Sequence, residues 1–269
     1  MNQQVLSLNY IDQISSNILE SSDPTYVENS LRHVLDFYDL VNYELSYDRT
    51  YWRARKCDHE SGFKNISELG CPPKHLVSAG RLNEPNSPML YVSPNQFSVL
   101  EEIGAEVNDY IHMIAYRQNQ EQKLRCGIVG EITQVQRWGT GLISDATSEQ
   151  INRVLNEMTH EVAKSFVFAD AFLSSILKDP NAKNSNYLHS RVLSKILLEK
   201  NEFIDAIVYP SVALESARNF AIKPDVANKK LSIASNFVLR INKKYKYGMY
   251  DFEVIKMASG QYGNGAIAW

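Results

Sequence analysis

From Leu6 to about Leu40, apolar residues recur at three- and four-residue intervals. They are Ile11, Ile14, Ile18, Leu19, Val27, Leu31, Val34, Leu35 and Tyr38. Positions three and four apart share one face of a helix, so this pattern predicts two short helices. Ser21-Ser-Asp-Pro24 separates them, because serine or aspartate caps a helix and proline opens one.

Later apolar runs predict strands. They are Leu45 to Ala54, Met89 to Val92, Ile103 to Ile114 and Ala206 to Tyr209. In the first run a two-residue period puts Arg53 and Arg55 on the same side, so both guanidinium groups can face one site. Near the C-terminus, two apolar runs flank Lys243-Lys-Tyr-Lys-Tyr-Gly248 and predict a hairpin; they are Ser235 to Ile241 and Asp251 to Met257.

Helical spacing returns between these strands. The predicted helices run from Ser93-Pro94 to Glu102, from Glu149 to Leu177 with Ser148 as a cap, and from Tyr187 to Lys200. The first of these helices would place a carboxylate about three turns from the end of the preceding strand.

The composition is that of an ordinary globular protein. The chain has 269 residues, of which 44% are apolar and 22% charged, and a formal net charge of −3. These values argue against disorder and give no indication of nucleic-acid or membrane binding. No apolar stretch approaches the ~20 residues that span a bilayer, so we expect no membrane association.

The cysteines indicate a reducing compartment. The chain has an odd number of cysteines, Cys57, Cys71 and Cys126. Its N-terminus lacks the basic and apolar regions of a secretory signal. We therefore expect free thiols and a cytoplasmic location. Cys57, His59, Cys71 and His75 do not have the spacing of a zinc finger, so no metal is expected.

Three separated segments place charged or hydroxyl groups in apolar or turn-forming surroundings. They are Tyr51-Trp-Arg-Ala-Arg55, then Gly80-Arg-Leu-Asn83 running through Tyr91 to Glu101-Glu102, and Asp205-Ala-Ile-Val-Tyr-Pro-Ser211. Such a pattern places a few charged groups on the rim of a buried sheet. It suggests an enzyme that acts on a phosphate-bearing nucleotide.

Together with Pro72-Pro73, Pro88-Met-Leu-Tyr91 and Asn219-Phe-Ala-Ile-Lys-Pro224, these segments resemble the RES domain family over about residues 46 to 226. The family is named after its motif arginine, glutamate and serine. The resemblance implies an α+β fold like that of the ADP-ribosyltransferase toxins, with mixed and antiparallel sheets. We expect a catalytic domain over residues 46–269 and an N-terminal helical extension over residues 1–45.

The resemblance also implies an activity. Members characterised as toxins cleave NAD, either by phosphorolysis to nicotinamide and ADP-ribose phosphate or by transfer of ADP-ribose to a protein, and are commonly neutralised by a helix-turn-helix antitoxin. We expect phosphorolysis, with inorganic phosphate as co-substrate. Protein modification, hydrolysis with water and an inactive nucleotide-binding module are the alternatives, and a homodimer is a further expectation.

The family motif assigns roles to individual residues of this chain. Arg53 matches the first motif arginine, Arg81 the arginine of the Gly-Arg segment, Tyr91 the strand tyrosine and Ser211 the motif serine. Asn219 resembles the asparagine that follows. We expect Arg53 and Ser211 to be catalytic, and Arg81, Tyr91, Asn83, Asn219 and Arg55 to bind NAD.

The motif glutamate requires a choice between two neighbours. In the family the acid follows the strand tyrosine by eleven positions and comes after a small residue. That position here is Glu102, although Glu101 replaces the small residue. We therefore assign Glu102 as the catalytic acid, and leave open whether Glu101 reshapes the site.

These residue types fit the chemistry. Cleavage between nicotinamide and ribose passes through an oxocarbenium-like state, which a fixed carboxylate stabilises. Arginine matches phosphate oxygens with two parallel hydrogen bonds. An aromatic face such as that of Tyr91 attracts a charged nicotinamide ring, and a serine at a strand end can hydrogen-bond ribose or phosphate.

Overall fold

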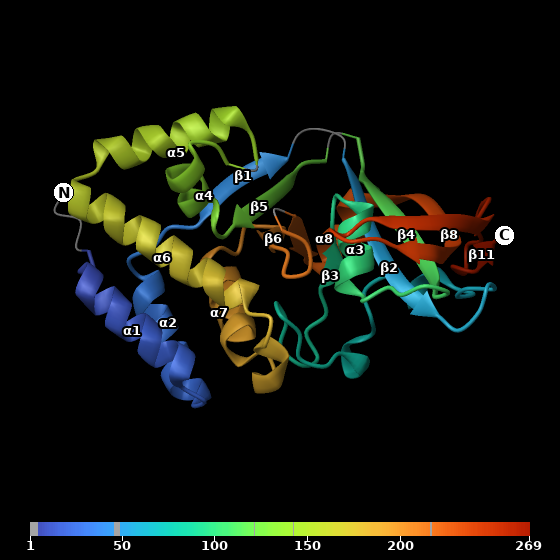
Figure 1. The fold of residues 1–269 in the computed structure, drawn as a ribbon, viewed down its shortest axis with the longest axis horizontal. Helices are drawn as coiled ribbons and strands as arrows, with labels where there is room; N and C mark the ends of the chain where they lie inside the picture. The colour runs from blue at the N-terminus through green and yellow to red at the C-terminus, as the bar shows by residue number, and fades with distance from the viewer. Residues whose placement is uncertain (1–4, 46–48, 121, 142, 216) are drawn as a thin grey trace. The chain divides into compact units, whose positions relative to one another are not determined.

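The computed structural model describes residues 5–45, 49–120, 122–141, 143–215 and 217–269, and the fold is α+β. Figure 1 shows its helices and strands. The chain forms two compact units. The first consists of Met1–Tyr43, Ala79–Glu84 and Gly127–Pro210; the second consists of Glu44–Ser78, Pro85–Cys126 and Ser211–Trp269. A separate domain over residues 1–45 stays a prediction.

The first unit is mainly helical. Its α-helices are α1 (Leu8–Glu20), α2 (Pro24–Leu35), α4 (Glu131–Trp138), α5 (Asp145–Glu157), α6 (His160–Lys178) and α7 (Leu188–Lys200), with the 3₁₀ turn η3 (Ala182–Ser185). Helix α1 packs along α6, and α2 packs along α7 (Figure 1). The strand β6 (Ala206–Pro210) is buried at every position. Strands β1 (Val41–Leu45), β5 (Leu124–Ile128) and β6 are neighbours in that order.

A buried carboxylate organises this unit. Asp170 on α6 is fully buried, and its Oδ1 accepts hydrogen bonds from the hydroxyl of Tyr38 at 2.7 Å and the amide of Gly130 at 2.9 Å. Its Oδ2 accepts the amide of Thr133 at 2.7 Å. Gly130 caps the start of α4 and Thr133 lies in its first turn, where N–H groups have no partner within the helix. Burial, together with the adjacent Asp170, raises the pKa of Tyr38, so the phenol stays protonated and donates.

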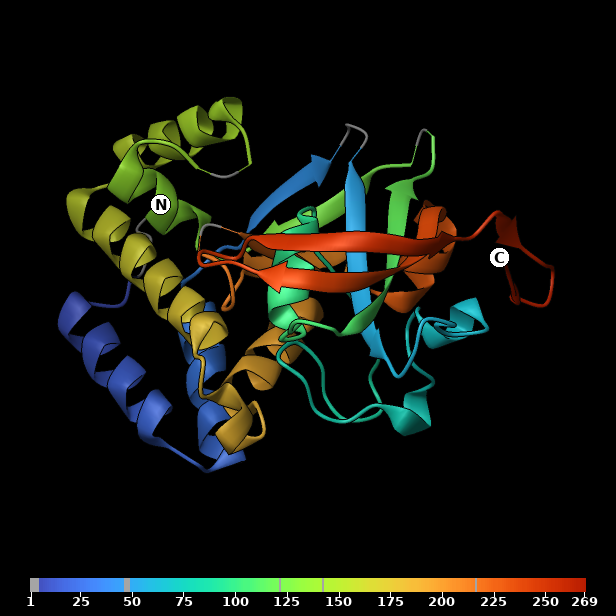
Figure 2. The same ribbon diagram turned by 45° about the vertical axis from the view of Figure 1, so that its right-hand side comes forward.

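The second unit is built on an antiparallel sheet. Its strand order is β2 (Thr50–Cys57), β4 (Tyr110–Gln118), β8 (Leu231–Lys244) and β9 (Tyr250–Met257). The β8–β9 hairpin is the long orange-red ribbon of Figure 2. Strand β3 (Leu90–Val92) pairs antiparallel with β7 (Arg218–Ile222). The unit also contains η1 (Ile66–Glu68), η2 (Lys74–Leu76), α8 (Pro224–Lys230), β10 (Gly260–Gln261) and β11 (Ile267–Ala268).

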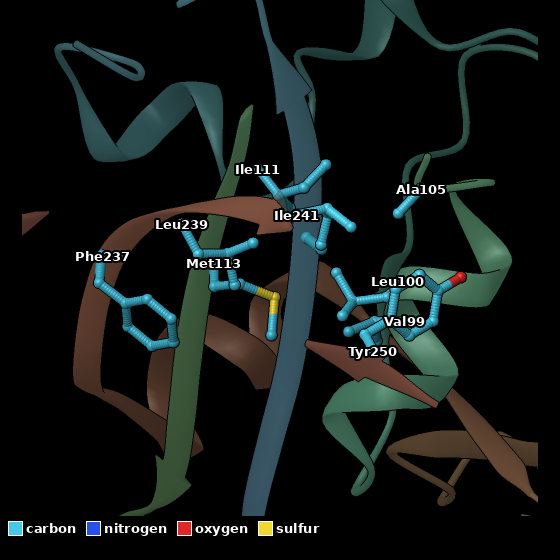
Figure 3. Packing of buried hydrophobic residues seen from close by; sticks show 10 residues of the cluster. Val99, Leu100, Ala105, Ile111, Met113, Phe237, Leu239, Ile241 and Tyr250 are labelled. Atoms are coloured by element: carbon cyan, nitrogen blue, oxygen red, sulfur yellow. The ribbon is translucent and has the colours of Figure 1, made fainter. Parts of the chain in front are cut away.

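A short helix, α3 (Gln96–Glu102), covers one end of this sheet. Its Val99 and Leu100 pack with Met113 of β4 and Leu239 of β8 (Figure 3). Burial of Val99 and Leu100 holds the apolar face of α3 against the core, so the polar C-terminal end of the helix points away from it.

The predicted helices over residues 6–40 and 187–200 and the C-terminal hairpin are confirmed. Asp23 caps α2 and Pro24 opens it, as the sequence predicts. Residues 46–48, at the start of the strand predicted from Leu45, lie outside the described residues.

Three predicted boundaries are wrong. The strand predicted from Ile103 begins at Tyr110, because Gly104 and Asn108 adopt positive φ and turn the chain before it. The helix predicted over residues 149–177 is two helices, since Thr159 caps a new one. Ser144, not Ser148, caps α5, and Ser148 is buried inside that helix.

No helix within the described part of the chain is long and apolar enough to cross a membrane.

Candidate functional site

Glu102 is the last residue of α3 and is exposed. The helix begins where the Asn95 side chain accepts the amides of Phe97 at 2.8 Å and Ser98 at 3.3 Å, which caps its first turn. With Val99 and Leu100 fixed in the core, the carboxylate of Glu102 projects from the end of the helix. Local capping and core packing therefore set its position.

Two residues distant in sequence hold this carboxylate. The Ser211 hydroxyl donates to Glu102 Oε1 at 2.7 Å, and the Asn219 side-chain amide donates to the same oxygen at 2.6 Å. Among the described residues, Oε2 accepts no hydrogen bond. One oxygen is thus fixed while the other is available to a ligand. We call Glu102, Ser211 and Asn219 the carboxylate cluster.

Ser211 follows directly after β6 and is buried. Its oxygen accepts hydrogen bonds from the amides of Ala213 at 3.2 Å and Leu214 at 3.1 Å, while its O–H donates a hydrogen bond to Glu102. A hydroxyl has one donor and two acceptor positions, so all are used. Ser211 is therefore a positioning residue for Glu102 in this state, and the predicted contact between Ser211 and a ribose or phosphate stays a prediction.

Asn219 lies in β7 and is buried, with a relative exposure of 5%. A buried side-chain amide in a strand has few rotamers, so the direction of its N–H donor is fixed by the sheet. The structure thus brings together three of the sequence-predicted site residues, Glu102, Ser211 and Asn219, across separations of 109 and 117 positions.

The neighbouring Glu101 has a different environment. Its Oε1 accepts the hydroxyl of Tyr250 on β9 at 2.6 Å. Burial, and then the hydrogen bond to Glu101, raise the pKa of Tyr250, so the phenol remains a donor. The two adjacent carboxylates therefore point to different partners. Sequence reasoning missed Tyr250, and no short motif marks it, because it reads as an ordinary apolar strand position.

Arg53 lies on β2 opposite Ile114 of β4. Its Nη1 donates to the backbone carbonyl of Tyr91 at 3.2 Å, while its Nε is buried and has no hydrogen-bond partner in the described structure. Burial lowers the pKa of this guanidinium, and burial raises the pKa of the nearby Tyr116 to about 12. No carboxylate of the described residues pairs with Arg53. A partly buried cation with spare donors is suited to an anionic ligand.

Arg55 does not share the partners of Arg53. It is exposed, donates to the carbonyl of Glu68, and lies over the ring of Phe63 at 4.8 Å. The two-residue period puts both arginines on one face of β2, as predicted, but their guanidinium groups have separate contacts.

Arg81 and Asn83 belong to the first unit. Arg81 Nη1 donates to the carbonyls of Leu177 and Asp179, both at 2.9 Å, at the C-terminal end of α6, and lies 5.8 Å from the ring centroid of Tyr187. A cation at a helix C-terminus satisfies carbonyls that lack helical partners. Asn83 is buried and donates from its side chain to the carbonyl of Glu84 at 3.0 Å. Both residues thus have structural contacts, and their predicted roles in binding NAD stay predictions.

No group of three or more His, Cys, Asp and Glu side chains that could hold a metal ion occurs among residues that the structure describes. No family model, curated protein or solved structure matches the chain.

Proposed function

We propose that this protein is an NAD-consuming enzyme with a RES-type, ADP-ribosyltransferase-like fold, and that it cleaves the bond between nicotinamide and ribose with inorganic phosphate as the acceptor. The observation that carries the proposal is the carboxylate cluster. Ser211 and Asn219 lie far from Glu102 in the sequence, and both donate a hydrogen bond to the same oxygen of its carboxylate.

The open oxygen of Glu102 has the chemistry that this reaction needs. It would accept a ribose hydroxyl and stabilise the positive charge that develops at the anomeric carbon. Ser211 and Asn219 hold the other oxygen, so the carboxylate does not have to reorganise as the charge forms. Glu102 is exposed, which leaves it accessible to a substrate.

The bond changes balance without a further reactant. The anomeric carbon–nitrogen bond breaks, its electron pair neutralises the pyridinium, and nicotinamide leaves. A phosphate oxygen then bonds to the anomeric carbon and gives ADP-ribose phosphate. The spare donors of Arg53 fit an anionic oxygen of NAD or of the attacking phosphate.

The test is incubation of the purified protein with NAD, with and without inorganic phosphate, followed by separation of the products. The proposal expects nicotinamide and ADP-ribose phosphate in equal amounts, and only when phosphate is present. ADP-ribose formed at the same rate without phosphate would identify a hydrolase, and a label carried from NAD onto a protein would identify a transferase. No turnover with any acceptor would leave only a nucleotide-binding module and overturn the proposal.

The toxin role and its partners are part of the same proposal. Expression of the active enzyme is expected to deplete cellular NAD and stop growth, and a Glu102→Gln variant is expected to do neither. Mass measurement of the protein, alone and co-expressed with a neighbouring helix-turn-helix gene product, tests the proposed antitoxin and homodimer.

A further inference from the structure

A groove of about 870 Å³ runs along α6 in the first unit. Helices α1 and α5 lie on either side of α6 in both views (Figures 1 and 2). Along α6 the groove is lined at intervals of three and four residues, which is one continuous face of the helix. The apolar part of this face consists of Ala163, Val167, Phe168, Ala171 and Phe172.

Helix α1 adds apolar surface that faces solvent. Leu8 and Leu19 line the groove and are 38% and 48% exposed. The groove thus combines the half-buried ring of Phe168 and the buried ring of Phe172 on α6 with exposed leucines on α1. A concave apolar surface of this size is within the range of ligand pockets, which span roughly 300–1,000 Å³.

Basic side chains line the groove from two helices. Arg137 of α4 and Lys164 of α6 both line it, and both are exposed. Lys164 lies near the start of α6, where His160 also lines the groove.

These cations have no counter-charge in the groove. No acidic side chain is among the described residues that line it. Neither the Arg137 side chain nor the Lys164 side chain has a hydrogen bond or ion pair with any residue that the structure describes. The groove thus combines apolar side chains with at least two exposed cations.

We propose that this groove binds an amphiphilic anion: a long acyl chain along α6 with its carboxylate between Arg137 and Lys164. The apolar length from Ala163 to Phe172 gives the tail surface to bury, and the two cations attract its head. This site is independent of the proposed reaction with NAD.

The lining favours a ligand with an anionic head, because the cations have no acidic neighbour among the described residues that form the groove. A single acyl chain is narrow enough to lie along one face of α6.

Calorimetric titration of the full chain with hexadecanoate, below its micelle concentration, tests this site. We expect saturable binding to one site per chain. Hexadecyltrimethylammonium carries the same tail with a positive head, and we expect it to bind at least tenfold more weakly. Equal affinity for the two amphiphiles, or no saturable binding of hexadecanoate, would overturn the proposal.

Two matched pairs of variants locate the ligand. Arg137→Ala with Lys164→Ala is expected to weaken hexadecanoate binding at least tenfold, and Lys178→Ala with Lys183→Ala, two exposed lysines outside the groove, is expected to leave it unchanged. Leu19→Asp is expected to weaken binding, and Val154→Asp is the control, because Val154 is 44% exposed but does not line the groove. Equal effects within either pair would place the ligand elsewhere.

Discussion

Two carboxylates, Asp170 in the first unit and Glu102 in the second, show opposite uses of the same group. Asp170 is fully buried, and both of its oxygens accept hydrogen bonds, three in all. Glu102 is exposed, and its two hydrogen bonds converge on one oxygen. A fully satisfied buried carboxylate can only support structure. A carboxylate that is held firmly but only half satisfied keeps an acceptor for a ligand.

The difference follows from where each group lies. Asp170 joins the start of α4, the middle of α6 and the Tyr38 phenol, so its contacts connect three parts of the first unit. Glu102 lies at the end of a short helix, beyond the apolar residues that fix that helix. The comparison predicts that substitution of Asp170 changes stability and that substitution of Glu102 changes activity.

The largest effect is expected for Glu102→Gln. The amide keeps the shape of the side chain but removes its negative charge, so we expect nicotinamide release to fall about 10²- to 10³-fold. Because the residue is exposed, the free energy of unfolding is expected to change by less than about 0.5 kcal/mol. Steady-state assays and urea unfolding of the same preparation measure both. A variant that is fully active would remove Glu102 from the chemistry.

The next largest effect is expected for Asp170→Asn. The amide nitrogen of the new asparagine would face the backbone or phenol donors that now bond to Asp170, so at least one buried donor would lose its acceptor. We therefore expect the free energy of unfolding to fall by about 2–3 kcal/mol. Urea unfolding measures this loss. Nicotinamide release per folded molecule is expected to stay unchanged. Unaltered stability would show that the cluster around Asp170 is not a structural centre.

A smaller effect is expected for Asn219→Ala. Glu102 would lose one of its two donors but keep its charge, so we expect kcat to fall about tenfold, which is ~1.4 kcal/mol. If Asn219 positions the carboxylate, the KM for NAD stays the same, and Asn219→Ser restores part of the activity because it keeps a donor. A rise in KM with unchanged kcat would instead make Asn219 a direct ligand of NAD.

The smallest effect concerns pH and His112 in the sheet of the second unit. His112 is buried; its Nδ1 accepts the amide of Phe63 at 3.0 Å, and its Nε2 bonds to Asn236. Burial lowers the pKa of His112 below its ordinary value of 6.5, so the unfolded chain binds a proton more readily than the folded one. Stability is therefore expected to be highest above pH 6.5 and to fall below it, by at most about 1.4 kcal/mol per pH unit.

Urea unfolding at several pH values tests this expectation. A His112→Gln variant has no imidazole to protonate and is expected to lose less stability between pH 7 and pH 5.5 than the wild type does. Identical slopes for the two proteins would assign the pH dependence to other groups.

The sequence predicts elements best where one face is apolar over several turns. Helices α1, α2 and α7 and the β8–β9 hairpin follow from periodicity and caps. The start of β4 was mispredicted because Ile103 to Asp109 is also rich in apolar residues, and only the backbone turns at Gly104 and Asn108 separate it from the strand. The local backbone conformation decided that boundary.

The candidate site shows a similar limit. The resemblance selects Glu102, Ser211 and Asn219, but residue spacing alone does not reveal that they meet, because long-range contacts depend on sheet pairing. The sequence spacing assigns Glu102 as the acid, but it does not reveal that the neighbouring Glu101 accepts the phenol of Tyr250. For Arg55, the two-residue period predicts the face of the strand but not the contacts of a long, flexible side chain.

The most direct test of the central claim compares nicotinamide release from NAD by Glu101→Gln and Glu102→Gln, two identical substitutions at adjacent positions. Glu101 is half-buried and bonds to the Tyr250 phenol, whereas Glu102 is exposed and is held by Ser211 and Asn219. The account therefore predicts that Glu101→Gln keeps activity within about threefold and that Glu102→Gln loses at least about 10²-fold. Loss of activity in Glu101→Gln with Glu102→Gln unaffected would contradict the account.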